Sequence, residues 1–218
     1  MVVLIKDYIN IADNSKDGIK MSQHLLRFME KSTSLSRDEI QEVMEAMVVE
    51  TYKKGTILLR QGEVSEKCYF ILNGCIRQYT IGEDGKEVTI NFFTEEQAVV
   101  LFKSYHQQTP CDYFLSCLED STVIVGDLDS EESMYHKFPI LEKVTRAMIE
   151  HNFGEEQEDK ARFMAAVPEE RYRMLLDKRP GLMNRVPQHQ LASYLGITPE
   201  SLSRIKKRVS LTTSNPNP

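Results

Sequence analysis

Residues 186–208, near the C-terminal end of the chain, read VPQHQLASYLGITPESLSRIKKR. Their apolar side chains recur at helical spacing on both sides of a glycine. Gly196 can take the left-handed conformation that ends a helix in a sharp turn, and Ile197 can fill the space between the helices. Thr198 is a good N-cap for the next helix, and Pro199 suits its first position. The inward residues of the first helix are Leu191, Ala192 and Leu195. The spacing therefore predicts two helices joined by a tight turn.

The second of these helices has a polar face that becomes basic toward its C-terminus. Its inward residues are Leu202, Ile205 and Val209, and its outward residues are Glu200, Ser203, Arg204, Lys206, Lys207 and Arg208. A recognition helix in the major groove of DNA needs this layout, because short polar groups and an arginine reach base edges while later cations meet phosphates. An amphipathic helical hairpin at the end of a domain has the same spacing, so the pattern alone leaves both interpretations open.

The distribution of charge favours the DNA interpretation. From Pro168 to the end there are nine Lys or Arg against four Asp or Glu, a net charge of +5; since the whole chain carries −6, the part before Pro168 carries −11. A phosphate backbone attracts local positive charge, whatever the net charge of the protein. An acidic protein with one basic end is typical of a sensor joined to a nucleic-acid reader.

The length and composition limit the class of protein. A chain of 218 residues, 41% apolar and 28% charged, suits a soluble protein of two modest domains. The sequence shows no run of membrane-spanning length and no signal-peptide pattern, which makes the cytoplasm the expected location. The four cysteines lack the spacing of a zinc or iron–sulfur site, and the five histidines are scattered. No metal site, evident cofactor or catalytic motif is therefore predicted.

The N-terminal part of the chain is expected to form a tail followed by two helices. Residues 1–20 are poorly amphipathic, and Met21 is an alternative start. A helix-like pattern follows. Ser36 and Glu39 form a capping-box sequence that begins a second helix, which the apolar pattern extends to Val49.

A change of period marks the next region as β-structure, beginning near Thr51. Its strand patterns are YKKGTILLRQGE (52–63), CYFILNGCIRQYT (68–80) and EDGKEVTINFF (83–93), with turns at Gly55, Gly62, Gly74 and Gly85. A further pair of strands is expected at 113–118 and 122–128. Closely spaced turns of this kind predict a compact antiparallel barrel or sandwich. The alternation fails over 94–109, which predicts an insertion, with a short helix at 97–105, over the mouth of the barrel.

Helical periodicity returns after Asp129. Pro139 lies near the start of a long helix that leads to Gly154 and the acidic run GEEQED. The apolar stripe of this helix is Ile140, Val144, Ala147, Met148 and His151. Such a stripe is either the end of a core helix or a dimer seam, and both remain open. A further helix runs from Pro168 to Pro180.

This order of a β-roll, a long connecting helix and a C-terminal helix-turn-helix resembles the CRP/FNR family of bacterial transcription regulators. The segments that carry the resemblance are GTILLRQGE (55–63), CYFILNGCIR (68–77), EDGKE (83–87) and LASYLGITPESLSRIKKRV (191–209). It covers roughly residues 25–209. The resemblance implies a homodimer whose paired recognition helices read a two-fold operator about one DNA turn, ~34 Å, apart.

The fold that the resemblance implies is α+β. It has an N-terminal antiparallel β-roll of the double-stranded β-helix or jelly-roll type with flanking helices, a long dimerisation helix and a C-terminal winged helix-turn-helix. The expected boundaries are 1–20 for the tail or extension, 21–137 for the β-roll sensor, 138–166 for the connecting helix and 167–218 for the DNA-binding domain.

The family's base-reading positions lie in the first turns of the recognition helix and correspond here to Glu200, Ser203 and Arg204. This set resembles the FNR branch rather than the CRP branch, in which an arginine would stand at the position of Pro199. Arg204 can donate two hydrogen bonds to guanine and Glu200 can accept one from cytosine, so half-sites with a TGA-like core are expected. The other candidate DNA contacts are Gln188, Thr198, Lys206, Lys207 and Arg208, with Ser193 as a phosphate or solvent contact. For each lysine, a merely solvated face is an equal alternative.

The sensor departs from the family at the phosphate cassette. Cyclic-nucleotide-binding relatives have a Gly-Glu pair, whose glutamate holds the ribose, and a later arginine that neutralises the phosphate. Here Val100 and Leu101 stand near the pair and Cys111 near the arginine. Without that arginine the phosphate charge would be buried unpaired, which is costly, and Lys103 is a weak substitute. An FNR-type N-terminal cysteine set and a haem ligand pair are missing too.

The effector pocket implied by the family architecture lies between the β-roll and the long helix. Its expected lining is Phe92, Val100, Leu101, Lys103, Cys111 and Tyr113, with the inward side of residues 141–148. The effector, if there is one, is unknown and is not expected to be cyclic AMP.

The sequence thus predicts a dimeric DNA-binding transcription regulator with a degenerate cyclic-nucleotide-type β-roll, no enzymatic activity, RNA polymerase as a further partner and no membrane association. The alternative is a small-molecule sensor whose C-terminal helices bind a protein. A cupin-like enzyme would need clustered metal-binding histidines, which the isolated His106 does not supply. Activation or repression and the target genes stay open.

Overall fold

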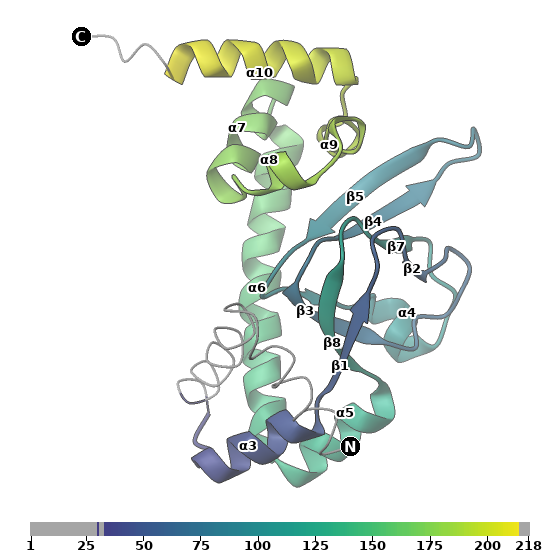
Figure 1. The fold of residues 1–218 in the computed structure, drawn as a ribbon, viewed down its shortest axis with the longest axis vertical. Helices are drawn as coiled ribbons and strands as arrows, with labels where there is room; N and C mark the ends of the chain where they lie inside the picture. Colours follow the sequence, from purple (N-terminus) through teal and green to yellow (C-terminus); the bar gives the residue numbers. More distant parts are fainter. Residues whose placement is uncertain (1–29, 31–32, 214–218) are drawn as a thin grey trace.

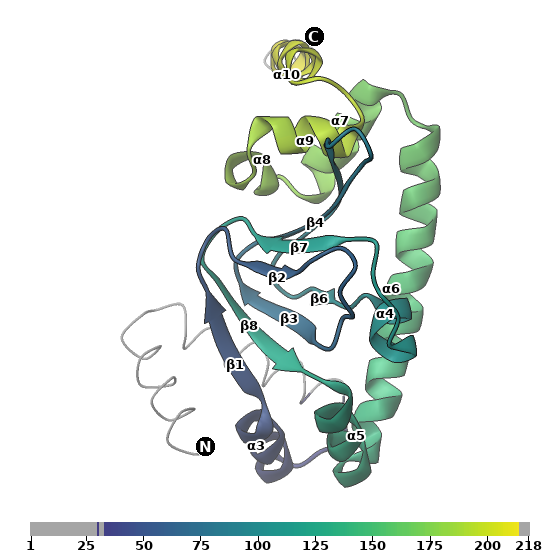
Figure 2. The ribbon, with the colours of Figure 1, turned by 90° about the vertical axis from the view of Figure 1, so that its right-hand side faces the viewer.

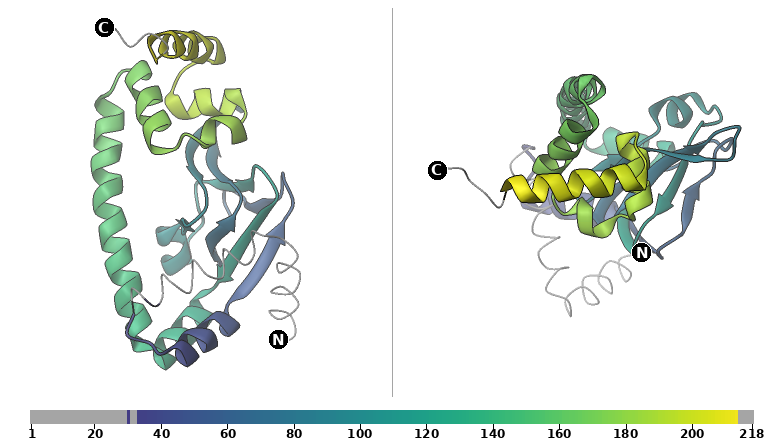
Figure 3. Two further views of the ribbon diagram at one scale, coloured as in Figure 1. Left: turned by 60° about the vertical axis from the view of Figure 1, so that its left-hand side comes forward. Right: turned by 90° about the horizontal axis from the view of Figure 1, so that it is seen from above.

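The computed structural model describes residue 30 and residues 33–213 (Figure 1). A β-roll lies beside one long helix, and a group of four helices covers the end of the roll (Figures 2 and 3). The helices outside that group are α3 (Arg37–Ala46), α4 (Phe102–Gln107), α5 (Leu128–Lys137) and α6 (Pro139–Ala165). None of the helices in the described ranges is both long and apolar enough to cross a membrane.

Two four-stranded antiparallel sheets form the roll, with the orders β1-β8-β3-β6 and β2-β7-β4-β5. The strands are β1 (Val48–Tyr52), β2 (Ile57–Leu59), β3 (Cys68–Asn73), β4 (Ile76–Ile81), β5 (Glu87–Phe93), β6 (Ala98–Val99), β7 (Phe114–Cys117) and β8 (Ser121–Gly126). Both sheets contribute to one apolar core, made by Leu59, Tyr69, Ile71, Ile76, Val99, Cys111, Leu115, Cys117 and Val123. The predicted fold class, an α+β chain with an antiparallel β-roll and flanking helices, is confirmed.

Two details of the strands differ from the sequence prediction. The strands expected at 113–118 and 122–128 are β7 and β8, but they belong to different sheets: β7 lies between β2 and β4, and β8 between β1 and β3. In the insertion, Ala98 and Val99 pair with β3, so the short helix α4 starts later than expected, at Phe102. Val99 is 1% exposed, because its pairing brings it into the core of the roll.

The capping box predicted at Ser36 and Glu39 is present at the start of α3. The helix ends at Ala46 rather than Val49, because Val48 and Val49 already pair with β8. The tail at 1–20 and the helix predicted before Ser36 fall outside the described residues.

The long helix α6 begins at Pro139 as predicted and continues through Gly154 and the acidic run. Its first turn is a core element, since Leu141 is 7% exposed and packs with Phe138 and with Ile40 of α3. Ile140 and Val144 of the predicted stripe are half-buried and Ala147 is exposed; the side chains of Met148 and His151 are not described. Farther along, Ile149, Phe153 and Met164 are exposed.

The C-terminal group consists of α7 (Pro168–Lys178), α8 (Leu182–Arg185), α9 (Gln188–Leu195) and α10 (Pro199–Thr213). After β8, the part of the chain that the structure describes contains helices only, so the predicted wing is not found there. A wing hairpin would follow the recognition helix, but α10 continues to Thr213. The hairpin of β4 and β5 in the roll packs against α9 instead (Figure 2).

Gly74, between β3 and β4, is expected to tolerate no side chain. Its φ is +121°, and a Cβ there would lie 2.3 Å from Oγ of the fully buried Ser121. Gly74→Ala should therefore lower the free energy of unfolding by about 2 kcal/mol or more, as backbone strain and overpacking add. Denaturant unfolding measures the change. Gly55→Ala is the matched control, because φ is +85° there but nothing lies within 4 Å of the added Cβ. Equal losses in the two variants would rule out the steric contribution.

Candidate nucleic-acid interface and effector site

The turn between α9 and α10 has the predicted geometry. Gly196 is left-handed, with φ 71°, and its N–H donates to the carbonyl of Ser193 at 3.1 Å. The N–H of Ile197 donates to the carbonyl of Ala192 at 2.9 Å, and the Ile197 side chain packs against the core of the C-terminal helices. These two bonds satisfy carbonyls that the end of α9 would otherwise leave unpaired.

The start of α10 is capped as the sequence predicts. The hydroxyl of Thr198 accepts from the N–H of Ser201 at 3.3 Å, and Pro199 is the first helical residue. The predicted inward residues Leu202, Ile205 and Val209 are buried, with exposed fractions of 0%, 4% and 6%. Since the cap and the buried face fix the helix, the direction of its outward side chains is fixed as well.

Most of the predicted outward residues are exposed. They are Glu200, Ser203, Arg204, Lys207 and Arg208, together with Thr198 and, at the start of α9, Gln188. Lys206 differs from the prediction: it is partly buried, and burial lowers the pKa of its ammonium group. Arg208 forms an ion pair with Glu169 of α7 at 2.9 Å. The exposed, readily available cations of this face are therefore Arg204 and Lys207.

Glu200 is placed to act as a hydrogen-bond acceptor. Hydrogen bonds from its own backbone N–H and from the Thr198 hydroxyl, with the nearby Arg204, hold the pKa of this carboxyl below its usual value. The first turns of α10 thus present a carboxylate, a hydroxyl and a guanidinium group on one exposed face. Groups of these kinds can distinguish bases in a major groove.

The residues predicted to line an effector pocket do not all come together. Leu101 and Cys111 belong to the core of the roll, Val100 and Tyr113 are half-buried, and Lys103 is exposed on α4. The prediction is wrong for Phe92, which is fully buried against the C-terminal helices, with its ring centroid 5.5 Å from that of Tyr194. Phe92 pairs with Arg77, and the side chains of both lie on the outer face of the sheet.

The core of the roll offers no cation to a phosphate. Among the buried residues that the structure describes, Arg77 is the one charged side chain, and it lies on the outer face of its sheet. Cys111, which stands near the position of the family's arginine, is 6% exposed, and its thiol donates to the carbonyl of Tyr113 at 3.2 Å. A phosphate buried there would remain unpaired.

A buried arginine in the roll was missed by the sequence analysis. Arg77 of β4 is 3% exposed, donates to Oγ1 of Thr89 at 2.9 Å and pairs with Glu87 at 2.5 Å, and its guanidinium group lies 4.2 Å from the ring centroid of Tyr79. Because it lies on the outer face and is already neutralised, it does not replace the missing arginine of the cassette. In the sequence, only the alternation of the strand indicates which face of the sheet Arg77 occupies, and it does not show that this face is covered.

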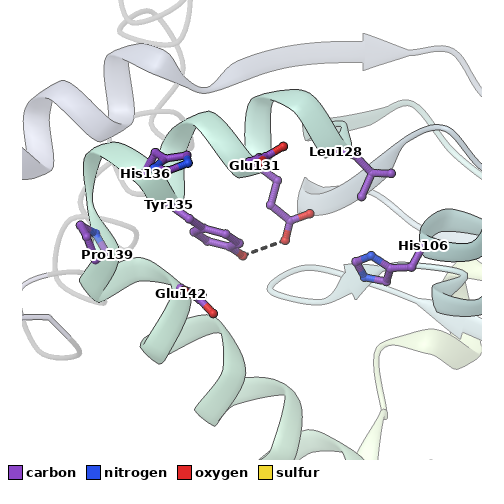
Figure 4. A pocket seen from close by; sticks show the side chains of 8 residues that line it. His106, Leu128, Glu131, Tyr135, His136, Pro139 and Glu142 are labelled. Atoms are coloured by element: carbon purple, nitrogen blue, oxygen red, sulfur yellow. Dashed lines mark hydrogen bonds between the residues drawn. The ribbon is translucent and has the colours of Figure 1, made fainter.

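A pocket of about 640 Å³ lies between α4, α5 and the start of α6 (Figure 4). It is lined by His106, Leu128, Glu131, Glu132, Tyr135, His136, Pro139 and Glu142. Of these, only Glu142 falls within the segment 141–148 that was predicted to contribute to a pocket. The Tyr135 hydroxyl donates to Glu131 at 2.7 Å, and burial raises the pKa of Tyr135 to about 12. In the sequence, this pocket is marked only by polar residues along α5, and such residues are equally typical of a solvent-exposed helix face.

The charge of this pocket does not suit an anion. Three of its eight lining residues are glutamates, and none is lysine or arginine. No group of three or more His, Cys, Asp or Glu side chains in the described ranges is arranged to hold a metal ion. The pocket is therefore a poor site for a phosphate-bearing nucleotide.

Comparison with known proteins shows what part of the β-roll region is similar to. Residues 49–137 match the family model described as the cyclic nucleotide-binding domain. No curated protein matches the chain.

Similar solved structures extend over most of the chain and show its fold. The global regulator CLP from Xanthomonas campestris, described as c-di-GMP responsive, has a TM-score of 0.61 at 14% identity, over 82% of this chain and 93% of its own. FixK2 from Bradyrhizobium japonicum has a TM-score of 0.61 at 19% identity, over 77% and 86%. A CooA mutant from Carboxydothermus hydrogenoformans has a TM-score of 0.60 at 16% identity, over 86% and 84%. Over residues 49–137 the chain is therefore similar to the cyclic nucleotide-binding domain, and its overall fold is that of the CRP/FNR-like structures.

Proposed function

We propose that this protein is a sequence-specific DNA-binding transcription regulator of the CRP/FNR type, which reads a two-fold operator as a homodimer. The observation that carries the proposal is the exposed face of α10, where Glu200, Ser203 and Arg204 precede Lys207. Base-reading groups in the first turns, followed by a cation for phosphate, are what a helix in the major groove requires. The similar folds support a regulator rather than an enzyme.

The base contacts follow from the chemistry of α10. Arg204 donates two hydrogen bonds to the N7 and O6 atoms of guanine, and the ionised Glu200 accepts from the amino group of cytosine. Both contacts suit a half-site with a TGA-like core. Gln188, Thr198 and Lys207 contact the sugar-phosphate backbone. In this role the protein acts in the cytoplasm, with RNA polymerase as a further partner.

The effector is not cyclic AMP, although residues 49–137 match the cyclic nucleotide-binding domain. Arg77, the one charged side chain among the buried residues that the structure describes, is already paired with Glu87, and the glutamate-lined pocket has no lysine or arginine for the phosphate. At 100 times its Kd, a ligand of the folded state adds about 2.7 kcal/mol of stability. Millimolar cyclic AMP or cyclic GMP should leave the Tm unchanged. A concentration-dependent rise in Tm with either nucleotide would contradict the assignment.

The experiment that tests the proposal is selection of bound sequences from a random duplex pool by the purified protein, at two salt concentrations and without added ligand. Enrichment of a palindrome with TGA-like half-sites supports a regulator that reads DNA without an effector. Affinity for the selected palindrome should fall as salt rises, because phosphate contacts release counterions. Lack of enrichment, with no salt-sensitive binding, would favour a sensor whose C-terminal helices contact a protein.

A further inference from the structure

The C-terminal helices are attached to the β-roll of the same chain by an apolar contact. Phe92 of β5 and Cys75, which precedes β4, are both fully buried in a core they share with Leu191 and Leu195 of α9. The outer face of the sheet therefore provides part of the core on which the predicted DNA-reading helices pack. An apolar contact of this kind holds the two parts together, but it is not directional.

A polar cluster beside this contact supplies the direction. Arg185, at the end of α8, donates to both carboxylate oxygens of Glu95 at 2.8 Å and to Glu119 at 3.0 Å. Glu95 follows β5 and Glu119 lies between β7 and β8, so one arginine joins the helices to two separate loops of the roll. Glu95 also accepts from the N–H of Gly74 at 2.9 Å. A two-pronged arginine pair of this geometry fixes orientation as well as distance.

Backbone groups of β5 complete the attachment. The N–H of Thr89 donates to the Ser193 hydroxyl of α9 at 3.0 Å, and that hydroxyl donates to the carbonyl of Glu87 at 3.3 Å. Arg179 donates to the carbonyl of Phe92 at 2.6 Å. Since β5 is an edge strand, these bonds occupy backbone groups that would otherwise face solvent. Ser193, a predicted phosphate or solvent contact, is thus engaged within the chain.

The attachment leaves the reading face of α10 free. Glu200, Ser203, Arg204 and Lys207 are exposed. In Figures 1 and 2, α10 lies on the far side of α9 from the β-roll. The polar cluster therefore does not cover the predicted DNA surface; it fixes the direction in which that surface points.

We propose that Arg185 is a positioning residue that, through Glu95 and Glu119, orients the DNA-reading helices on the β-roll and so sets the spacing of the two half-sites. This inference rests on the proposed function. A two-fold operator requires both recognition helices of a dimer to meet the DNA at a fixed separation, whereas one half-site requires only one intact reading surface. Arg185 should therefore matter for a full operator and not for a half-site.

The charge balance of the cluster predicts an asymmetry between its members. One guanidinium group faces two carboxylates, so removing Arg185 leaves Glu95 and Glu119 to repel each other at an interface where both are about one-third exposed. Removing one carboxylate leaves a complete ion pair. Arg185→Gln should therefore open the contact more than Glu95→Gln does.

The test combines hydrogen exchange without DNA with binding to three duplexes: the full operator, one half-site and a scrambled sequence. In Arg185→Gln, exchange of the β5 peptide that contains the Thr89 amide should rise, and affinity for the full operator should fall by at least about tenfold. Affinity for the half-site and scrambled duplexes should be unchanged. Arg37→Gln is the control, because it makes the same charge change at a residue whose side chain is 81% exposed on α3.

A second variant keeps the test decisive if Arg185→Gln is poorly folded. The charge swap Arg185→Glu with Glu95→Arg should restore both slow exchange and at least part of the operator affinity. Unchanged exchange in Arg185→Gln, or equal loss of affinity for all three duplexes, would overturn the positioning role. If the wild-type protein selected no operator while Arg185→Gln still raised exchange in β5, the proposed function would fail and the contact between the helices and the roll would stand.

Discussion

Replacing Arg204 by alanine is expected to lower sharply the preference of this protein for its operator over scrambled DNA. Arg204 is exposed in the second turn of α10, where its guanidinium group can reach the N7 and O6 atoms of one guanine. Loss of this contact should cost about 1–3 kcal/mol at each half-site. The two-fold operator contains two such contacts, so its affinity should fall further than that of a single half-site. Competition binding against scrambled duplex measures the difference.

Lys207→Ala is the matched comparison on the same exposed face, three residues further along α10. If Lys207 contacts phosphate, its loss should weaken binding to every duplex about equally. The slope of the logarithm of the binding constant against the logarithm of the salt concentration should become less steep by about one for each subunit. Arg204→Ala should therefore change the discrimination between operator and scrambled DNA, whereas Lys207→Ala should change the affinity for both. Undiminished discrimination in Arg204→Ala would show that Arg204 does not read a base.

The features that could be predicted from the sequence are those determined by local chemistry. Gly196 was predicted to end one helix and Thr198 to cap the next, and both predictions are confirmed. A left-handed turn and an N-cap each depend on only a few adjacent residues. The capping box at Ser36 is a similar case. The alternation of β4 and β5 likewise predicted the roll, since it reflects one buried face.

The errors concern contacts between segments far apart in the sequence. Phe92 has the same alternation whether its face is covered by the inner core or by α9, so its partner could not be predicted from the strand itself. The wrong prediction of a wing has the same kind of cause. The hairpin that packs on α9 is formed by β4 and β5, which lie far earlier in the chain. The pocket beside α5 was missed for another reason: Glu131 and Glu142 look like solvent-facing helix residues until α4 is placed next to them.

A dimer seam was one of two interpretations left open for the predicted stripe of the long helix, Ile140, Val144, Ala147, Met148 and His151. The exposed apolar side chains of α6 lie on the opposite face of the helix and favour a seam there instead. Ile149, Phe153 and Met164 are 39%, 64% and 69% exposed. Their separations of four and eleven residues bring them to one face of a helix with 3.6 residues per turn. Exposed apolar residues aligned in this way along a helix are typical of an interface with a second helix.

Phe153→Glu is therefore expected to convert a dimer into a monomer. Burying a phenylalanine stabilises by about 1.5–3 kcal/mol, and a two-fold interface contains two copies, so the dimer should lose about 3–6 kcal/mol. Since 1.4 kcal/mol is a factor of ten, the dimer Kd should rise by at least about 100-fold, before repulsion between the glutamates is added. Sedimentation equilibrium over a range of concentrations measures this change directly.

The same substitution at Phe102 is the control, because that ring is 47% exposed on α4 and lies outside α6. Phe102→Glu should leave the dimer intact. Operator binding by Phe153→Glu should weaken by about 10²–10⁴, because a monomer loses the second, effectively intramolecular binding event. Binding to a single half-site should be kept, because the surface of α10 is unchanged. A Phe153→Glu protein that sedimented as a dimer would place the dimer contact elsewhere, and α6 would then be a connecting helix only.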